Sequence, residues 1–102
     1  MKHKIFAVDF DGTLCKNAWP EIGEPKTEMI KNIKKLRQDG HEIILWTCRE
    51  GDDLEKAVSW CADQGLTFDA VNDNLERIKE LFGGNSRKIV ADFYIDDKAL
   101  PV

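Results

Sequence analysis

One short stretch near the N-terminus constrains the fold more than any other part of the chain. Residues 5–8 (Ile-Phe-Ala-Val) form an apolar run, and Asp9, Asp11, Gly12 and Thr13 follow at once. A near-continuous apolar run is typical of a strand that is buried on both faces in a parallel sheet. In open α/β sheets, ligands bind beyond the carboxyl ends of the strands. The stretch therefore predicts a buried strand that delivers two carboxylates to a crevice.

The same stretch has a plainer interpretation. An Asp-Gly pair after an apolar run also occurs in ordinary turns, where the aspartate caps the backbone. Two carboxylates this close repel each other unless a cation lies near them. We therefore favour a functional site over a simple turn, and the rest of the chain has to decide between them.

The order of the other segments predicts an α/β fold. Strands are predicted at residues 42–46, 67–71 and 89–95, and helices at residues 26–39, 52–64 and 75–82. Strands and helices alternate, which indicates parallel strands with right-handed crossovers. We expect one domain over residues 1–102, a three-layer Rossmann-like domain with a parallel sheet and helices on both faces. Residues 15–24 are rich in turn formers and predict a surface loop or a small hairpin.

Composition and charge argue against several classes of partner. The formal net charge of -4 gives no electrostatic reason for tight binding to nucleic acid or to an anionic membrane. No apolar run is long enough for a signal peptide or a membrane span. The three cysteines form neither an even set nor a closely spaced metal-type pair, which is simplest to explain by reduced thiols in a cytoplasm. We expect a cytoplasmic protein with no membrane partner, and a nucleic-acid partner is possible but not favoured.

Reactive side chains follow each of the longer predicted strands. Asp9 and Asp11 follow the first strand, Thr47 follows the second, and Asp96 and Asp97 follow the last. Because the carboxyl ends of parallel strands meet at one edge, these groups should converge there. Four carboxylates need a cation to offset their repulsion, and Mg²⁺ fits best because it takes oxygen ligands and keeps room for water and phosphate.

On these residues the chain resembles the haloacid dehalogenase superfamily of phosphohydrolases over nearly its full length. The Asp-x-Asp-x-Thr motif of that superfamily corresponds to residues 9–13, and its apolar strand ending in Thr or Ser to residues 43–47. Its lysine is best matched by Lys88, with Arg87 as the alternative, and its acidic pair by residues 96–97. Each motif is weak alone, but all four occur here in order.

The resemblance implies a phosphomonoesterase that works in two steps. Asp9 would attack phosphorus and become an aspartyl phosphate. Asp11 would protonate the leaving oxygen and then take a proton from the attacking water. Thr47 and Lys88 would hold the phosphoryl oxygens.

The resemblance also implies a magnesium site. The carboxylates of Asp9 and Asp96 and the backbone carbonyl of Asp11 would ligate Mg²⁺, and Asp97 would support these ligands without coordinating the ion. The partner of the site would be a phosphorylated substrate: a small metabolite, a nucleotide or a phosphorylated macromolecule.

The chain departs from the superfamily pattern in two ways. The gaps where relatives usually insert cap domains hold only a short loop and ordinary sheet-and-helix chain, so we expect a small capless member with an open crevice. Such members often act on macromolecules or borrow a neighbouring subunit as a lid. The chain also stops soon after Asp97, where many relatives continue, so a homodimer is conceivable.

Two further side chains have both a functional and a structural interpretation. Arg49, directly after the second predicted strand, could contact the leaving group of a substrate or belong to a solvated loop. Trp19 could stack on a substrate ring or pin its own loop onto the domain. Residues 72–74 (Asn-Asp-Asn) are interpreted as a helix cap and not as ligands.

The main alternative function is a non-catalytic Mg²⁺- and phosphate-binding module or a phospho-switch. Receiver domains also gather acids, Thr and Lys around Mg²⁺ on a parallel sheet. Their phosphorylated aspartate lies on a middle strand, where this chain has only Asp69, ahead of the strand end. The order of the motifs therefore favours the enzyme.

Overall fold

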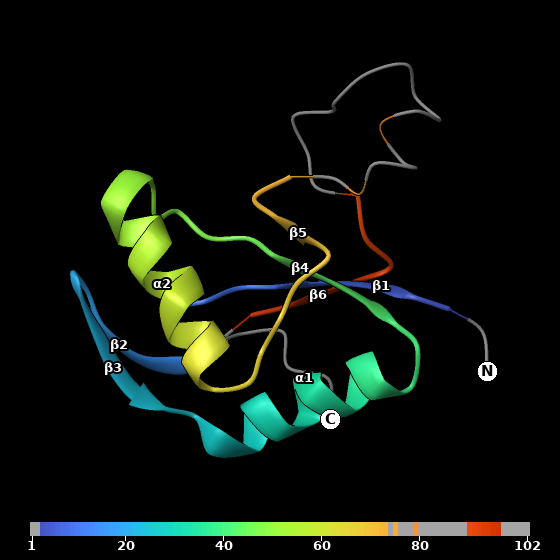
Figure 1. The fold of residues 1–102 in the computed structure, drawn as a ribbon, viewed down its shortest axis with the longest axis horizontal. Helices are drawn as coiled ribbons and strands as arrows, with labels where there is room; N and C mark the ends of the chain where they lie inside the picture. Colours follow the sequence, from blue (N-terminus) through green and yellow to red (C-terminus); the bar gives the residue numbers. More distant parts are fainter. Residues whose placement is uncertain (1–2, 74, 76–78, 80–89, 97–102) are drawn as a thin grey trace.

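The computed structural model describes residues 3–73, 75, 79 and 90–96, and these form a small α/β unit (Figure 1). The elements in chain order are β1 (Ile5–Val8), β2 (Cys15–Ala18), β3 (Glu21–Pro25), α1 (Thr27–Gln38), β4 (Glu42–Leu45), α2 (Gly51–Asp63), β5 (Ala70–Val71) and β6 (Phe93–Ile95).

The main sheet has the strand order β5-β4-β1-β6, and its pairs are parallel. Val8, the last residue of β1, is level with Leu45 of β4 on one side and with Ile95 of β6 on the other. The carboxyl ends of these three strands therefore lie side by side at one edge of the sheet. The expectation of a parallel sheet is confirmed for the described strands.

Alternating side chains of the strands enter two apolar clusters, one on each face of the sheet. Phe6 and Val8 of β1 and Ile43 of β4 belong to the larger cluster, which both helices cover with residues such as Ile33 and Cys61. This is the expected result of right-handed crossovers from β1 to β4 and from β4 to β5, because both place their helix on the same face.

The opposite face of the sheet carries the smaller cluster. Ile5 and Ile44 pack there with Leu75, and Ala70 and Ala91 lie against them. The predicted third helix, residues 75–82, lies for the most part outside the described residues. The coarse α/β class is therefore established, with a mostly parallel sheet and two described helices.

Residues 15–25 form an antiparallel hairpin of β2 and β3, which resolves the choice between a loop and a hairpin. In Figure 1 the hairpin lies beyond the end of β1, on the side where β4 leads into α2. Gly23 permits the close pairing, because a Cβ atom there would lie against the carbonyl oxygen of Lys16.

Three predicted boundaries differ from the structure. The second helix begins one residue before its predicted start at residue 52: α2 starts at Gly51, with Glu50 as the N-cap and Asp52 in the first turn. There its charge still favours the positive end of the helix. The third strand is shorter than predicted and pairs only at Ala70–Val71, because the preceding residues 65–69 form the connector from α2. The last strand spans Phe93–Ile95, and its predicted start at residue 89 lies outside the residues that the structure describes.

Candidate functional site at the carboxyl edge of the sheet

The predicted site residues follow the ends of three adjacent strands. The backbone N–H of Asp9 donates to the Ile95 carbonyl (2.9 Å), which joins the residue after β1 to the end of β6. On the other side of β1, the N–H of Trp46 donates to the Val8 carbonyl (3.0 Å). Asp9, Thr47 and Asp96 therefore leave the sheet at the same edge.

Asp9 lies at the base of this edge and is partly exposed. Its Oδ1 accepts a hydrogen bond from the backbone N–H of Phe10 (2.8 Å), which holds this oxygen close to the backbone. Phe10 itself is fully buried in the main cluster. The nucleophile predicted from the sequence is therefore held on a rigid piece of backbone.

The Asp11 carboxylate forms a two-point ion pair with Arg49. Arg49 Nε donates to Asp11 Oδ2 (2.9 Å) and Arg49 Nη2 donates to Asp11 Oδ1 (2.8 Å). The hydrogen bonds and charge of Asp11 raise the pKa of the Arg49 guanidinium above its already high usual value. The sequence predicted both residues as site candidates but not their direct pairing.

Arg49 is buried, with 1% of its surface exposed. Its guanidinium carbon lies 5.2 Å from the ring centre of Phe10 and 4.8 Å from that of Trp19. Two further donors reach the hairpin, where Nη1 donates to the Pro20 carbonyl (3.2 Å) and Nη2 to the Glu21 carbonyl (3.0 Å). The interpretation of Arg49 as part of a solvated loop is therefore wrong.

Trp19 is exposed over 55% of its surface at the turn of the hairpin, although its ring lies near the Arg49 guanidinium. It lines a cavity of about 320 Å³ together with Asp11, Asn17, Cys48 and Arg49. This cavity directly adjoins one of the two predicted catalytic carboxylates. Both interpretations of Trp19, as a platform for a ligand and as an anchor for its loop, are compatible with this position.

Asn72 supports the loop that carries Thr47. Its Oδ1 accepts from the backbone N–H of Thr47 (2.7 Å), and its Nδ2 donates to the Arg49 carbonyl (3.4 Å). Thr47 Oγ1 in turn accepts from the N–H of Arg49 (3.2 Å). Asn72 has a positive φ of 51°, which asparagine tolerates better than most residues. Its position just after a strand, at the same edge, was the signal in the sequence that could have identified this role.

Several predicted residues lie outside the described part of the chain, namely Arg87, Lys88 and Asp97. Among the described residues, Lys79 is a cation that the sequence analysis did not consider. Its Nζ lies 2.8 Å from Asp73 Oδ2, and Asp73 comes two residues after β5. Lys79 is therefore bound to the segment that follows β5, and β5 is the strand next to β4.

Asp69 has a structural environment away from this edge. Its Oδ2 accepts from Arg37 Nη1 (2.7 Å) and from the backbone N–H of Ile43 (2.7 Å). It precedes β5, whereas the site residues follow their strands. The aspartate on which the receiver-like alternative depends thus links α1 to β4 at the opposite edge.

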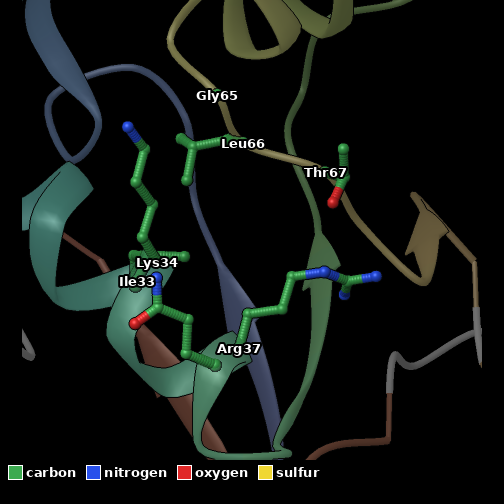
Figure 2. A pocket seen from close by; sticks show the side chains of 7 residues that line it. Ile33, Lys34, Arg37, Gly65, Leu66 and Thr67 are labelled. Atoms are coloured by element: carbon green, nitrogen blue, oxygen red, sulfur yellow. The ribbon is translucent and has the colours of Figure 1, made fainter.

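Another cavity, of about 360 Å³, lies near Asp69 between α1 and the connector to β5. Figure 2 shows the side chains of Ile33, Lys34 and Arg37 on the helix, and residues 65–67 facing them from the connector. None of the predicted site residues lines it. The cavity therefore contributes nothing to the candidate site.

The metal ligands predicted at the carboxyl edge are all oxygen atoms. Within the residues that the structure describes, no three His, Cys, Asp or Glu side chains gather as a metal site. A site made of two carboxylates and a backbone carbonyl does not require three such side chains. The donor set of Asp9, Asp96 and the Asp11 carbonyl fits Mg²⁺, which takes few protein oxygens and retains water.

All three cysteines are free. Cys48 is exposed next to Thr47, while Cys15 and Cys61 are buried. Burial raises the pKa of the Cys15 thiol, and it raises that of Cys61 to about 12. Both buried thiols therefore stay protonated near neutral pH.

None of the helices in the described residues has the length and apolar character that crossing a membrane requires.

Comparisons with known proteins add one relative. No protein-family model and no curated protein matches this chain. A solved structure described as the conserved protein coded by a locus from Bacteroides thetaiotaomicron is 41% identical to it, with a TM-score of 0.85. The match covers 96% of this chain and 78% of the other. The chain belongs to the same family as this conserved protein. The Bacteroides relative supports the α/β fold, and its description names no activity.

Proposed function

We propose that this protein is a Mg²⁺-dependent phosphatase of the haloacid dehalogenase type. It hydrolyses a phosphomonoester through an aspartyl phosphate on Asp9. We propose further that the domain is a three-layer Rossmann-like unit without a cap. The apolar clusters on both faces of the sheet support this arrangement, because each face needs a covering layer.

One observation carries the proposal: chemically distinct groups from separate parts of the chain meet at one edge of the sheet. Asp9 and Asp96 follow two strands that pair directly, β1 and β6. Thr47 follows β4, the neighbour on the other side. Ligand sites of open α/β sheets occur at this edge. Acids and a hydroxyl gathered here suit the binding of a metal ion and a phosphoryl group.

The proposed reaction uses Asp9 and Asp11 in different roles. Asp9 attacks phosphorus, and the bond from phosphorus to the leaving oxygen breaks. Asp11 gives a proton to that oxygen, then accepts one from the water that hydrolyses the aspartyl phosphate. When bound by Asp9, Asp96 and the Asp11 carbonyl, Mg²⁺ offsets the negative charge of the phosphoryl group.

Thr47 and Lys88 are proposed to hold the phosphoryl oxygens. The contacts of Thr47 with Asn72 and Arg49 support a fixed position for its loop. Lys88 lies outside the described residues, with Arg87 as its alternative and Asp97 as the proposed support of the metal ligands.

The substrate is proposed to place its leaving group in the cavity beside Asp11 and Trp19. A volume of about 320 Å³ is at the small end of ligand pockets, which supports a compact leaving group or the end of a larger molecule. We also propose that the protein is cytoplasmic and forms a homodimer, in which the neighbouring subunit covers the open crevice.

A phospho-switch is less well supported than an enzyme. It would need a phosphorylated aspartate on a middle strand, and Asp69 is engaged by Arg37 and Ile43 at the far edge. A binding module without turnover would have no use for a second carboxylate in the position of Asp11.

The test is phosphate release from a generic aryl phosphate, with and without Mg²⁺. We expect metal-dependent turnover that falls at least about 100-fold in Asp9→Asn, because the nucleophile is lost. Asp39→Asn is the matched control, since this exposed aspartate at the end of α1 pairs only with Lys35 among the contacts described. Unchanged turnover in Asp9→Asn would contradict the mechanism.

A further inference from the structure

We propose that Arg49 is a positioning residue that holds the Asp11 carboxylate in place for proton transfer. This inference rests on the proposed phosphatase function, because it assigns a support to the general acid of that reaction. The motifs of the resemblance do not include Arg49. The inference comes from the contacts of its side chain.

The geometry of the pair restrains Asp11 strongly. Two N–H groups of Arg49 bind the two oxygens of one carboxylate, at 2.9 and 2.8 Å. A single hydrogen bond lets a carboxylate rotate, whereas two parallel bonds fix its plane. Each carboxylate oxygen has a second lone-pair direction, which is left for the proton and the leaving oxygen.

Arg49 is itself restrained by several contacts. Its guanidinium carbon lies 5.2 Å from the ring centre of Phe10 and 4.8 Å from that of Trp19, and two of its donors bind the carbonyls of Pro20 and Glu21. A group that positions a catalytic side chain must be rigid, since a displacement of about 1 Å can cost much of the rate.

The same contacts favour positioning over direct binding of the substrate. A guanidinium has five N–H groups. Four of them are engaged, two with Asp11 and two with the hairpin. With 1% of its surface exposed, Arg49 presents only a small part of its side chain to the cavity that it lines.

The position also explains what the hairpin does for the site. Arg49 is bound to the Asp11 carboxylate on one side and to the backbone of residues 20–21 on the other. The turn of the hairpin is thereby connected to the general acid through one side chain. Support for Asp11 depends on the hairpin being in place.

The experiment compares two phosphate esters in wild type and Arg49→Lys. An aryl ester with a nitrophenolate leaving group needs no proton, whereas an alkyl phosphate needs the general acid. The quantity measured is kcat/KM, which reports steps up to the transfer of the phosphoryl group. Lysine keeps the positive charge but cannot form the two-point pair.

We expect kcat/KM for the alkyl ester to fall by about 10- to 100-fold, within the range of general-acid catalysis, and that for the aryl ester by less than about threefold. In an Asp11→Asn background, Arg49→Lys should cause no further loss, because both changes remove the same function. Arg37→Lys is the matched control, since it alters another Arg–Asp pair at the far edge. Both esters should then react as in wild type.

An equal loss for both esters in Arg49→Lys would overturn the inference while leaving the phosphatase in place. Wild-type protein that hydrolyses neither ester would overturn the proposed function and the inference with it. If Arg49→Lys does not fold, Gly23→Ala loosens the guanidinium from the other side, because the hairpin whose carbonyls bind it must shift. It should show the same preference for the aryl ester, and an unchanged ratio of the two kcat/KM values would overturn the inference.

Discussion

At the residue scale, Arg49 is a charged side chain that is almost entirely removed from water, and it connects Asp11 to the hairpin. Moving such an ion out of water costs several kcal/mol, which must be offset by its partners. The Asp11 carboxylate, two backbone carbonyls and two aromatic rings offset that cost. Asp11 and the hairpin are therefore energetically as well as geometrically linked.

The buried thiol of Cys61 gives a prediction about stability and pH. Burial raises its pKa from the usual 9.0 to about 12 in the folded protein. The unfolded chain therefore loses this proton first as the pH rises. The free energy of unfolding should fall between about pH 9 and pH 12, by up to about 1.4 kcal/mol per pH unit from this group.

Urea unfolding of wild type and Cys61→Ala at pH 8 and at about pH 10.5 measures this contribution. We expect the alkaline loss of stability to be smaller in Cys61→Ala by about 1 kcal/mol or more. Cys48→Ala, which changes an exposed cysteine, should lose as much stability as wild type. The same loss in Cys61→Ala as in wild type would contradict the prediction.

At the scale of helices and strands, the sequence predicts the elements whose residue pattern is local, that is, within a few neighbouring residues. The apolar run of β1 and the helical spacing of Ile30 and Ile33 in α1 could be recognised from neighbouring residues alone. The hairpin of β2 and β3 was only one of two options, because its turn residues also suit an open loop. Its stability depends on contacts across the chain, such as those of Arg49 with residues 20–21.

Gly23 provides a test of the hairpin. In Gly23→Ala the new methyl group would collide with the Lys16 carbonyl, so the two strands must separate. We expect a loss of about 1 to 3 kcal/mol in the free energy of unfolding, as for other overpacked sites. The rate of phosphate release from an alkyl phosphate should fall as well, because the support of Arg49 moves with the hairpin.

Urea unfolding and phosphate release measure the two effects of Gly23→Ala. Glu24→Ala is the control within the same hairpin. It removes an exposed ion pair with Lys16 and should change stability by less than about 0.5 kcal/mol. A Gly23→Ala protein with wild-type stability and activity would show that the hairpin does not support the site.

At the scale of the whole molecule, the parallel sheet gathers the site from distant parts of the chain. That Asp9, Thr47 and Asp96 would share an edge could be predicted, because each follows a strand and the strands alternate with helices. The pairing of Asp11 with Arg49 and the support of Thr47 by Asn72 could not, since they depend on how loops fold back over that edge. The roles of Arg87, Lys88 and Asp97, which lie outside the residues that the structure describes, stay predictions from the sequence.

The most direct test of the whole account is to locate the phosphoryl group on the protein. Asp11→Asn suits this experiment: an aryl phosphate with a good leaving group can still load Asp9, but the water that would release it lacks its base. The protein is mixed with this ester and Mg²⁺, quenched in acid and digested, and the phosphorylated peptide is identified by mass spectrometry. The account predicts a phosphoryl group on Asp9, absent when Asp9→Asn is added to the same protein. A phosphoryl group on Asp69, or none on any aspartate, would contradict it.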